Sequence, residues 1–585
     1  SLVSKPSSAP TAGSEIKTNL ALELKPLDLK EKEVFPYKMR SSNNQFTNHV
    51  TYDKSTSLSN FISNSQPLTV IEIPGGEYEL NISIKSPIHI KSANGQKVTL
   101  KGTGNSEVIQ SASPYLILEG LDIDQQSTTW GALVISTGFT KILKCDIKSA
   151  NYPPLSIQGS TAANDDNAYV EAEDCHFTGA EKSCIQMQRD SSLYIKNSVI
   201  EGSQMYGIWA QSGSQCYVDK GCVIRNNTIA GINVQKRCKL RIESGVELVD
   251  NKDSGVEIVD ESVAVIEGVK VTGTGHLAAI YSCFNSFVTI RNSQIENNQS
   301  IALRSESEST ILSTDNKFSD CYSSSFFMCH VSSFIQSEND TISGSCSAAV
   351  VSIEKGYIEC RNLSIKDLAG VGVVSYDHAS IRMTNSKISN ITQVAIQIRD
   401  WSKLYLEDVG ISNSQQTGIS LTHNAIAYIK HCQISRTNEL GIQIANVNQG
   451  FVDIVDCESF ENNKGGILIQ DNVYEGRCNI KDCQFNKNGR LGVNANGNNT
   501  MPRFENCSFI GNAVVGAHVL NGAEITLINS IFKGEGQNGI VLNNAIAHVE
   551  KAEFSDFQTS AVTCSNAGNA TISNCSIHDN CSFGC

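Results

Sequence analysis

The sequence contains little proline, no long apolar run and no excess of basic residues. Only 11 of its 585 residues are proline, so the chain is rarely interrupted. No stretch is long and apolar enough to span a membrane, and we expect no membrane insertion. The net charge of −14 at pH 7 argues against nucleic-acid binding, which needs basic surfaces. The first residues, Ser-Leu-Val-Ser-Lys-Pro, lack the apolar core of a signal peptide, although a mature secreted chain would look the same.

Sustained helical periodicity is also missing, and a short motif recurs in its place. The motif is a small residue, any residue, and then Ile, Phe, Val or Leu, as in Cys507-Ser508-Phe509. Its spacing averages about 24 residues over about 20 copies, which is typical of a solenoid. The apolar anchors of the motif fall at residues 123, 147, 177, 200, 224, 248, 271, 295, 318, 342, 365, 388, 411, 434, 460, 485, 509, 532, 554 and 577.

Each repeat contains a second signal, a glycine followed by an apolar residue, as in Gly207-Ile208 and Gly255-Val256. Polar stretches separate the two signals. Asparagines such as Asn226-Asn227 follow several anchors, where they tolerate the left-handed backbone angles of a sharp turn. Three short strands with polar corners in each repeat predict one coil of a parallel β-helix. A leucine-rich horseshoe is the alternative, but the regular Leu and Asn positions that it needs are missing.

Residues 70–90 contain the turn Pro-Gly-Gly-Glu-Tyr (74–78) directly after an apolar segment. This turn resembles the entry coil of right-handed parallel β-helix proteins of the pectate-lyase-like superfamily, and the repeats after it resemble the generic repeats of that superfamily. Among intracellular members, the chain looks most like the β-helix regions of F-box-only and SHC-binding β-helix proteins. The resemblance implies an all-β fold, a single-stranded right-handed parallel β-helix solenoid of about 20 or more coils.

Three regions follow from these patterns. Residues 1–50 lack periodicity and are predicted to form a flexible or partner-ordered tail, in which Leu20-Ala-Leu-Glu-Leu and Leu27-Asp-Leu could form a short docking element. Residues 51–110 are predicted to form the entry cap and first coils, including a short N-terminal capping helix that begins after Ser57. Residues 111–585 are predicted to form the β-helix repeats.

The 20 cysteines do not by themselves indicate a disulfide-rich secreted protein. Many of them share one position of the repeat with Ser and Val, and Cys457 lies one residue away from it. A position shared by Cys, Ser and Val is small and faces inward, where a free thiol behaves as a small hydrophobe. We therefore expect a reduced, packed ladder, and the spacing of the cysteines does not fit a structural zinc site. The shared position is occupied by Cys145, Cys175, Cys222, Cys432, Cys483, Cys507 and Cys575.

No catalytic arrangement stands out. Polygalacturonases of the resembling superfamily use an Asp-Asp pair and then Gly-His-Gly one coil later. Here Asp165-Asp166 is the only paired-aspartate insertion, and His276 lies about four coils, or roughly 19 Å, further on, which is too far for a shared glycosidic bond. Asp260-Glu261 and the pair Glu306 and Glu308 lie on different coils and cannot supply the about 6–8 oxygens of a calcium site. We predict no catalytic residue, no metal and no cofactor.

One surface has the composition of a binding site. Corner loops of three successive coils carry aromatic, basic and acidic residues, and these should stack within about 5–10 Å of one another. Trp, Tyr and Arg are enriched at interaction hot spots. A solvated corner whose aromatic rings cover the coil edge is the alternative. The candidate partner-binding residues are Tyr376, Asp377, His378, Arg399, Asp400, Trp401 and His423.

The sequence therefore predicts a rigid, non-catalytic scaffold that binds other proteins along its length and through its N-terminal tail. By resemblance, it would be cytoplasmic and could belong to a cytoskeletal or ciliary assembly. Two alternatives stay open: a carbohydrate-binding or polysaccharide-cleaving β-helix, and a secreted surface or adhesion protein. The fold does not decide among them, because one scaffold supports many functions.

Overall fold

The structure is a computed structural model of the 585-residue chain, and it describes residues 27–30, 46–159, 167–179, 181–322, 324–534 and 536–580. Most of the tail predicted for residues 1–50, including Leu20-Ala-Leu-Glu-Leu, lies outside these ranges. The regular elements of the described residues are almost all β-strands, joined by turns. No helix among them is long and apolar enough to cross a membrane.

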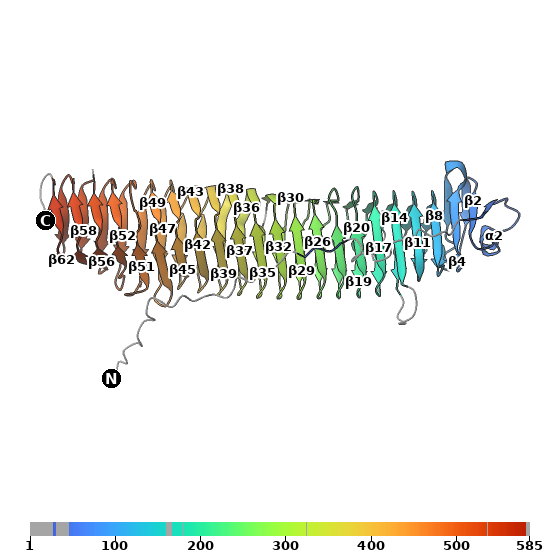
Figure 1. The fold of residues 1–585 in the computed structure, drawn as a ribbon, viewed down its shortest axis with the longest axis horizontal. Coiled ribbons are helices and arrows are strands. Elements are labelled where there is room, and N and C mark those ends of the chain that lie inside the picture. Colours follow the sequence, from blue (N-terminus) through green and yellow to red (C-terminus); the bar gives the residue numbers. More distant parts are fainter. Residues whose placement is uncertain are drawn as a thin grey trace, which may run out of the picture. The chain divides into compact units, whose positions relative to one another are not determined.

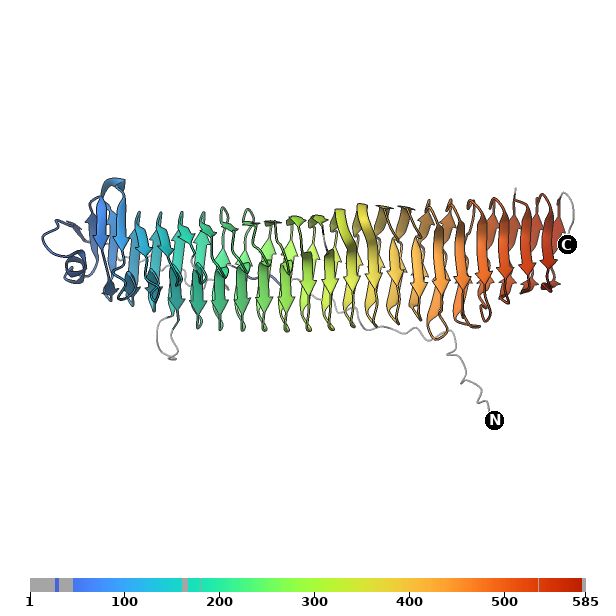
Figure 2. The ribbon, with the colours of Figure 1, turned by 180° about the vertical axis from the view of Figure 1, so that it is seen from behind.

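The chain divides into two compact units. The first comprises Leu27–Val374 with Ala379–Ile381, and the second comprises Ser375–His378 with the chain from Arg382 onward. In each unit short parallel strands lie side by side, and the chain advances by one coil from strand to strand (Figure 1; Figure 2). Among the described residues, sheet A contains 23 strands, about one in each coil. Sheet B consists of a run of 36 strands and a separate run of four, β54 (Ser508–Ile510), β57 (Ile531–Lys533), β60 (Glu553–Ser555) and β63 (Ser576–His578). The all-β solenoid of 20 or more coils is confirmed.

One coil of the second unit shows how the repeat folds. β45 (Ile426–Lys430) belongs to sheet A, whereas β46 (Gln433–Ser435) and β47 (Leu440–Ala445) belong to sheet B. All three pair in parallel with the strands of the next coil, so that Ile442 lies opposite Ile467. Because side chains alternate across a strand, each strand has inward and outward positions. Equivalent positions of successive coils line up into rows along the axis, and the inward rows are apolar.

The strands that carry the features described below have these bounds. In sheet A of the first unit they are β8 (Tyr115–Glu119), β20 (Gln215–Val218), β23 (Lys239–Ile242), β26 (Val263–Glu267), β29 (Phe287–Arg291), β32 (Thr310–Thr314) and β35 (Phe334–Glu338). In sheet B of the first unit they are β19 (Tyr206–Gln211), β22 (Ala230–Gln235), β25 (Ser254–Val259), β28 (Ala278–Cys283), β31 (Ile301–Ser305) and β34 (Ser325–Cys329). In the second unit they are β41 (Ile396–Ile398), β42 (Lys403–Glu407), β44 (Ile419–Thr422), β48 (Phe451–Val455), β51 (Cys478–Lys481) and β56 (Glu524–Ile528).

The apolar anchors of the repeat form the core. In the second unit four phenylalanines stack along the coil axis, with ring centroids 5.7 Å apart for Phe485–Phe509, 4.6 Å for Phe509–Phe532 and 4.9 Å for Phe532–Phe554. Each of these rings is at most 1% exposed. Offset-stacked aromatic pairs add to the free energy gained by burial alone, so this column stabilises the contact between successive coils.

The inward position two residues before each anchor is the cysteine slot. Cys432, Cys457 and Cys483 are all buried there as free thiols, and the backbone N–H groups of Cys432 and Cys457 each lie 3.4 Å from the sulfur of the next coil. The sequence prediction that Cys457 lies one residue off this slot is wrong. The register pairs Ile434 with Ser459, so Ser459 and not Phe460 is the anchor of that coil.

In the first unit the same slot contains a buried aspartate, Asp340, which is 1% exposed. Its carboxylate accepts hydrogen bonds from the hydroxyls of Ser313 (2.6 Å) and Ser337 (2.7 Å) and from the N–H of Asn316 (2.7 Å). Burial still outweighs these bonds and raises the pKa of Asp340 to about 6. The slot therefore accepts a carboxylate only where neighbouring coils supply donors.

A second inward ladder is made of asparagine. Asn488 accepts from the backbone N–H of Asn462 (3.1 Å), and its own N–H donates to Asn512 Oδ1 (3.0 Å). The side-chain amides also bond to one another along the axis at 3.1 Å. The sequence placed asparagines at the turn, and this is confirmed at Asn226, whose φ is 55°. In the coil of Asn488 the left-handed residue is instead Lys487, with φ of 54°, while Asn488 points inward. Its amide satisfies turn N–H groups that would otherwise be buried without a partner.

The entry cap contains the predicted helix. α2 (Leu58–Ser63) begins after Ser57, whose hydroxyl accepts from the N–H of Asn60 at 3.3 Å, as expected of an N-cap. Leu58 and Ile62 are its buried residues. β1 (Asn48–Thr51) pairs in parallel with β2 (Thr69–Ile73) as a strand of sheet A, and its four residues are exposed.

Candidate functional site

The structure brings the predicted corner residues together in the second unit. The guanidinium carbon of Arg399 lies 4.8 Å from the centre of the Tyr376 ring, and the rings of His378 and Trp401 stack with centroids 6.5 Å apart and planes 7° apart. The backbone N–H of Trp401 donates to the backbone carbonyl of His423 at 3.3 Å. We call this surface the corner patch; it comprises Tyr376, Asp377, His378, Arg399, Asp400, Trp401 and His423.

Backbone geometry explains why polar residues occupy these corners. Asp377 and His378 both have positive φ, at 59° and 61°, and Asp400 and Trp401 follow the same pattern at 54° and 64°. Two consecutive left-handed residues turn the chain between the sheets, and Asp is among the residues that tolerate this conformation best. The corner patch thus has a structural role that does not depend on binding, and partner binding there stays a prediction.

The residues that the sequence analysis considered as catalytic or calcium-binding candidates do not come together in one site among the described residues. Asp165-Asp166 lies outside the described residues. Asp260 and Glu261 occupy a corner like those above, with φ of 54° and 59°. His276 is exposed, and no pairing of it with these acids is seen among the described residues.

A different set of side chains meets on the outer face of sheet B in the first unit. Parallel register places one outward residue from each of five neighbouring strands, β19, β22, β25, β28 and β31, in a single line. Neighbouring positions in such a line are about 4.8 Å apart. We call this line the polar row; from β19 to β31 it comprises Trp209, Asn233, Glu257, Tyr281 and Arg304.

Two members of the polar row are buried although they face outward. Asn233 is 4% exposed and Glu257 is 7% exposed, and the amide of Asn233 donates to Glu257 Oε2 at 2.6 Å. Burial raises the pKa of Glu257, which favours the protonated acid. Asn233 Oδ1 and the indole N–H of Trp209 are buried and find no hydrogen-bond partner among the described residues. Unpaired buried polar atoms cost free energy, and a water molecule or a polar ligand group that reached them would satisfy them.

The other end of the polar row carries a charged network. The Arg304 guanidinium lies 5.7 Å from the centre of the Tyr281 ring, and Glu306 accepts hydrogen bonds from Tyr281 Oη and Arg304 Nε, both at 3.1 Å. His330 links Glu306 (3.4 Å) to Glu354 (3.0 Å). Burial is the main cause that raises the pKa of Tyr281, so its hydroxyl remains a donor at neutral pH. Arg304 is thus held in place by residues on both sides.

The sequence analysis missed the polar row, although a signal was present. The residue after each glycine-apolar pair is the outward one, and in Gly207-Ile208-Trp209, Gly231-Ile232-Asn233 and Gly255-Val256-Glu257 it carries functional chemistry. The equivalent residues of the second unit include Gln397, Ser420, Gln443 and Leu468. The sequence analysis used the glycine-apolar pairs only to locate the repeat. The spacing of the pairs does not show whether the outward residue after each pair is buried.

Stacked tyrosines form another feature on the outer face of sheet A in the second unit. The ring centroids of Tyr405 and Tyr428 are 5.2 Å apart, and the two ring planes are nearly parallel. The rings lie beside a shallow pocket of about 250 Å³ that Arg382 and Asp453 also line. Burial raises the pKa of both tyrosines. Because the rings cover each other's faces, they stabilise the coil stack and leave little aromatic surface for a ligand.

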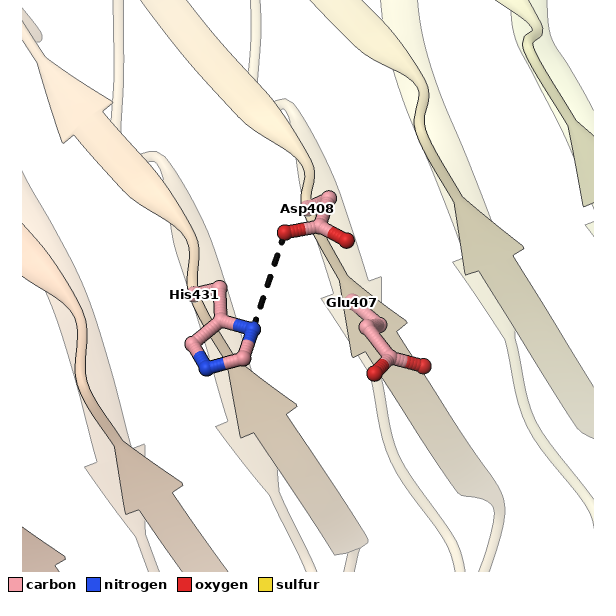
Figure 3. Close-up of side chains that lie close together, drawn as sticks. All are labelled: Glu407, Asp408 and His431. Carbon is pink, nitrogen blue, oxygen red and sulfur yellow. Dashed lines mark ion pairs between the residues drawn. The ribbon is translucent and has the colours of Figure 1, made fainter.

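Glu407, Asp408 and His431 in the second unit have one potential metal-ligand atom each within 4.8 Å of the others (Figure 3). His431 Nδ1 lies 3.6 Å from Asp408 Oδ1, and its Nε2 lies 3.5 Å from Asp456. The sequence did not predict this cluster. Its ion pairs are those of an exposed acidic surface, which commonly forms without a metal.

The sequence profile of the family described as right handed beta helix region matches residues 117–244, 220–364, 349–509 and 491–585. The chain belongs to this family. The match covers most of the chain and agrees with the sheets described above. No curated protein sequence matches the chain. The finer resemblance to F-box-only and SHC-binding proteins, and the cytoskeletal or ciliary setting, gain no support from these comparisons.

Several solved structures are similar to this chain at low identity. The alginate lyase AlyGC of family PL6 shares 10% identity over 90% of this chain and 99% of its own, with a TM-score of 0.25. The catalytic domain of a GH87 α-1,3-glucanase in complex with nigerose shares 13% over 65% of this chain and 66% of its own, with a TM-score of 0.28. A mannuronic-acid-specific family 6 lyase from human gut microbiota shares 11% over 66% and 86%, with a TM-score of 0.24.

These matches contradict the prediction that the chain is not an enzyme. That prediction rested on the lack of a recognisable catalytic motif, whereas the similar solved structures are polysaccharide-cleaving enzymes. We therefore withdraw it. At such low identities and TM-scores the likeness shows the fold alone and assigns no activity to this chain.

Proposed function

We propose that this protein binds a carbohydrate through the polar row. The observation that carries the proposal is the combination of Trp209, Asn233 and Glu257 on adjacent strands, with two buried polar atoms that have no partner among the described residues. Sugars present both apolar ring faces and many hydroxyls. An aromatic ring beside an unpaired amide oxygen and a carboxyl group offers a partner for each.

Each part of the row has a separate role in this proposal. Trp209, with Tyr206 tilted against it at 5.7 Å, provides aromatic surface. Asn233 and Glu257 would form hydrogen bonds with hydroxyls. Arg304, held by Glu306, would bind an acidic group or a further hydroxyl at the other end. Because the row crosses five strands, it would accommodate a chain of several sugar units rather than a single sugar.

The proposal is tested by binding of the full chain to a panel of neutral glucan and acidic polyuronide oligosaccharides, measured by calorimetry. We expect Trp209→Ala to weaken binding of the preferred oligosaccharide at least about tenfold, which corresponds to about 1.4 kcal/mol. Gln443→Ala is the matched control, because Gln443 occupies the equivalent outward position of the second unit. Circular dichroism establishes that both variants remain folded.

The same samples show whether the bound oligosaccharide is cleaved. Glu257 is a candidate proton donor, because burial raises its pKa and so favours the protonated acid. Glu257→Gln preserves its shape while removing the acid. Release of shorter sugars by the parent chain and its loss in Glu257→Gln would extend the proposal from binding to catalysis. If no oligosaccharide in the panel binds, or if Trp209→Ala binds as tightly as the parent, the proposal is wrong.

Protein binding through the corner patch is a second candidate function, supported by the contact between Arg399 and Tyr376. Arg399 is exposed, whereas Tyr376 and Trp401 are half-buried. Arginine beside aromatic residues on adjacent coils is typical of interaction hot spots. The double variant Arg399→Ala with Trp401→Ala should lose the main protein recovered in a pull-down from the native source. Asp165→Asn with Asp166→Asn should keep that protein. Equal recovery by both variants would remove the corner patch from consideration.

A further inference from the structure

Four residues of the N-terminal region, 27–30, lie on the outer face of sheet A in the first unit, more than 200 residues away in the sequence from the strands that they contact. The backbone N–H of Leu27 donates to Thr289 Oγ1 on β29 at 3.0 Å. Arg241 on β23 donates from Nη1 to the carbonyl oxygen of Leu29 at 2.8 Å. Side chains of sheet A thus bind one backbone N–H and one backbone carbonyl of the segment. These two hydrogen bonds fix the direction in which the segment runs.

The side chain of Leu29 anchors the segment. It is 7% exposed and belongs to an apolar cluster with Tyr217 and Val265, against which Leu27 and Val263 also pack. Val265 is fully buried and Thr289 is 1% exposed, although both occupy outward positions of sheet A. An apolar outer face on a β-helix needs a cover, because outward residues otherwise meet water.

Charge distinguishes this contact from simple apolar packing. Asp28 Oδ1 lies 3.5 Å from Arg241 Nη1 and 3.8 Å from Arg291 Nη2. Both arginines are also held by Glu267, at 3.3 and 2.9 Å, so their positions do not depend on Asp28. The two arginines therefore form a carboxylate-binding site that is held in place by Glu267. The apolar contacts of Leu27 and Leu29 lie on either side of this site.

We infer that this face of sheet A is a peptide-docking surface for an extended apolar–acidic–apolar segment, and that Leu27-Asp28-Leu29 is its occupant within the same chain. Among the described residues, the contact includes one well-buried leucine, two hydrogen bonds to the backbone of the segment, and ion pairs from the 58% exposed Asp28 to two arginines. Such a contact is weak on its own. A tether supplies an effective concentration of about millimolar, so the segment stays bound in cis and can still be displaced by a peptide of the same chemistry.

The surface should bind a separate peptide of this kind when substitutions weaken the contact of the chain's own segment with sheet A. The test uses the full chain carrying Asp28→Lys and Leu29→Asp, together with a fluorescent peptide of residues 24–33, and measures anisotropy. We expect this variant to bind the peptide at least about tenfold more tightly than the parent chain, whose surface is occupied. A peptide that itself carries Asp28→Lys should bind at least about tenfold more weakly, because it places a cation between two arginines.

Thr289→Val, added to the double variant, removes the acceptor for the peptide N–H with little change in shape. It should weaken peptide binding by about three- to tenfold. Thr526→Val is the matched control, because Thr526 occupies an outward position on β56 of sheet A in the second unit. It should leave the affinity unchanged. Equal effects of the two substitutions would place the peptide elsewhere and overturn the inference.

A measurement on the parent chain is independent of the variants. An excess of unlabelled peptide should speed amide hydrogen exchange in residues 27–30, because the competing peptide releases the segment, and exchange at Thr526 and its neighbours should not change. The inference is overturned if the peptide leaves exchange in residues 27–30 unchanged, or if the double variant and the parent bind it equally. Loss of oligosaccharide binding at the polar row would not bear on these outcomes, because that site is on sheet B.

Discussion

Replacement of Cys483 by Asp tests which residues the cysteine slot can hold. The slot is buried in every coil described above, and at Asp340 it already contains a carboxylate. The two positions differ in their donors. Asp340 has three, from two serine hydroxyls and one backbone N–H. Cys483 lies 3.4 Å from a single donor, the N–H of Cys457, and its thiol faces the carbonyl oxygens of Lys481 (3.0 Å) and Ile454 (3.6 Å).

The cost of the substitution can be bracketed from these contacts. At Asp340 the pKa rises from 3.8 to about 6 despite three hydrogen bonds, which corresponds to about 3 kcal/mol of destabilisation at pH 7. At Cys483 an aspartate would have one donor and two facing acceptors, so it would take up a proton. Holding a proton at pH 7 on a group with an ordinary pKa near 3.9 costs about 4 kcal/mol. We therefore expect Cys483→Asp to lower local stability by about 3–4 kcal/mol at pH 7.

The sign of the pH dependence follows from the same shift. A folded-state pKa above the unfolded value means that stability is greatest below the unfolded pKa and falls as the pH rises towards the folded one. The variant should therefore recover towards parental stability between pH 7 and pH 4. Cys483→Ser should be mild at all pH values, because serine fills this slot in other coils and can donate to the same carbonyls.

Amide hydrogen exchange measured by mass spectrometry resolves the effect along the chain, because a solenoid opens locally. Peptides covering residues 455–512 should exchange at least about 100-fold faster in Cys483→Asp than in the parent at pH 7, after correction for intrinsic rates. Peptides from the first unit serve as the internal control. If Cys483→Asp exchanges like the parent at pH 7, the slot faces solvent and the assignment of inside and outside is wrong.

Two further predictions concern the same inward ladders. Asp340→Asn should raise stability by about 3 kcal/mol at pH 7 and leave it unchanged near pH 4, because Asn has no carboxyl group to ionise. Its Oδ1 can still accept from the N–H of Asn316, and its NH2 group can donate to the two serine hydroxyls in place of accepting from them. Thermal melts between pH 4 and 8 should show the gap opening from about pH 4 to 6. Asn488→Ala should cost about 2–3 kcal/mol, because it leaves the N–H and side-chain amide of Asn462 without their acceptor, whereas the exposed Asn438→Ala should change stability by less than about 0.5 kcal/mol. Hydrogen exchange over residues 430–512 measures both asparagine variants, and equal effects would show that the buried amide ladder contributes nothing.

The fold could be predicted because the β-helix repeat is local in sequence. An anchor such as Ile434 and a glycine-apolar pair such as Gly441-Ile442 recur in each coil, and a period-two strand with a polar corner has few ways to bury its apolar face except by stacking on its own copy. Even Ser57 as the helix cap follows from local chemistry. The one error of register, at Cys457, arose because Phe460 is a better apolar anchor by composition than Ser459.

What could not be predicted depends on contacts between residues far apart in the sequence. The corner patch was found because its residue types are unusual within single loops, whereas the polar row is made of ordinary outward residues. Asn233 and Glu257 become informative only when their burial and their mutual hydrogen bond are known. The prediction of no enzyme failed for a related reason, since it looked for motifs and a β-helix assembles its sites from single residues on successive coils.

The sequence by itself thus determined the repeat, the inward rows and the order of the coils, because these follow from side-chain alternation within about 24 residues. Only the tertiary structure decided which outward residues are covered. Sheet register brings Trp209, Asn233 and Glu257 into one line across three coils. Folding back of the N-terminal segment places Asp28 between Arg241 and Arg291. Neither result is encoded in a local pattern, because both depend on the burial and charge of residues that spacing alone does not relate.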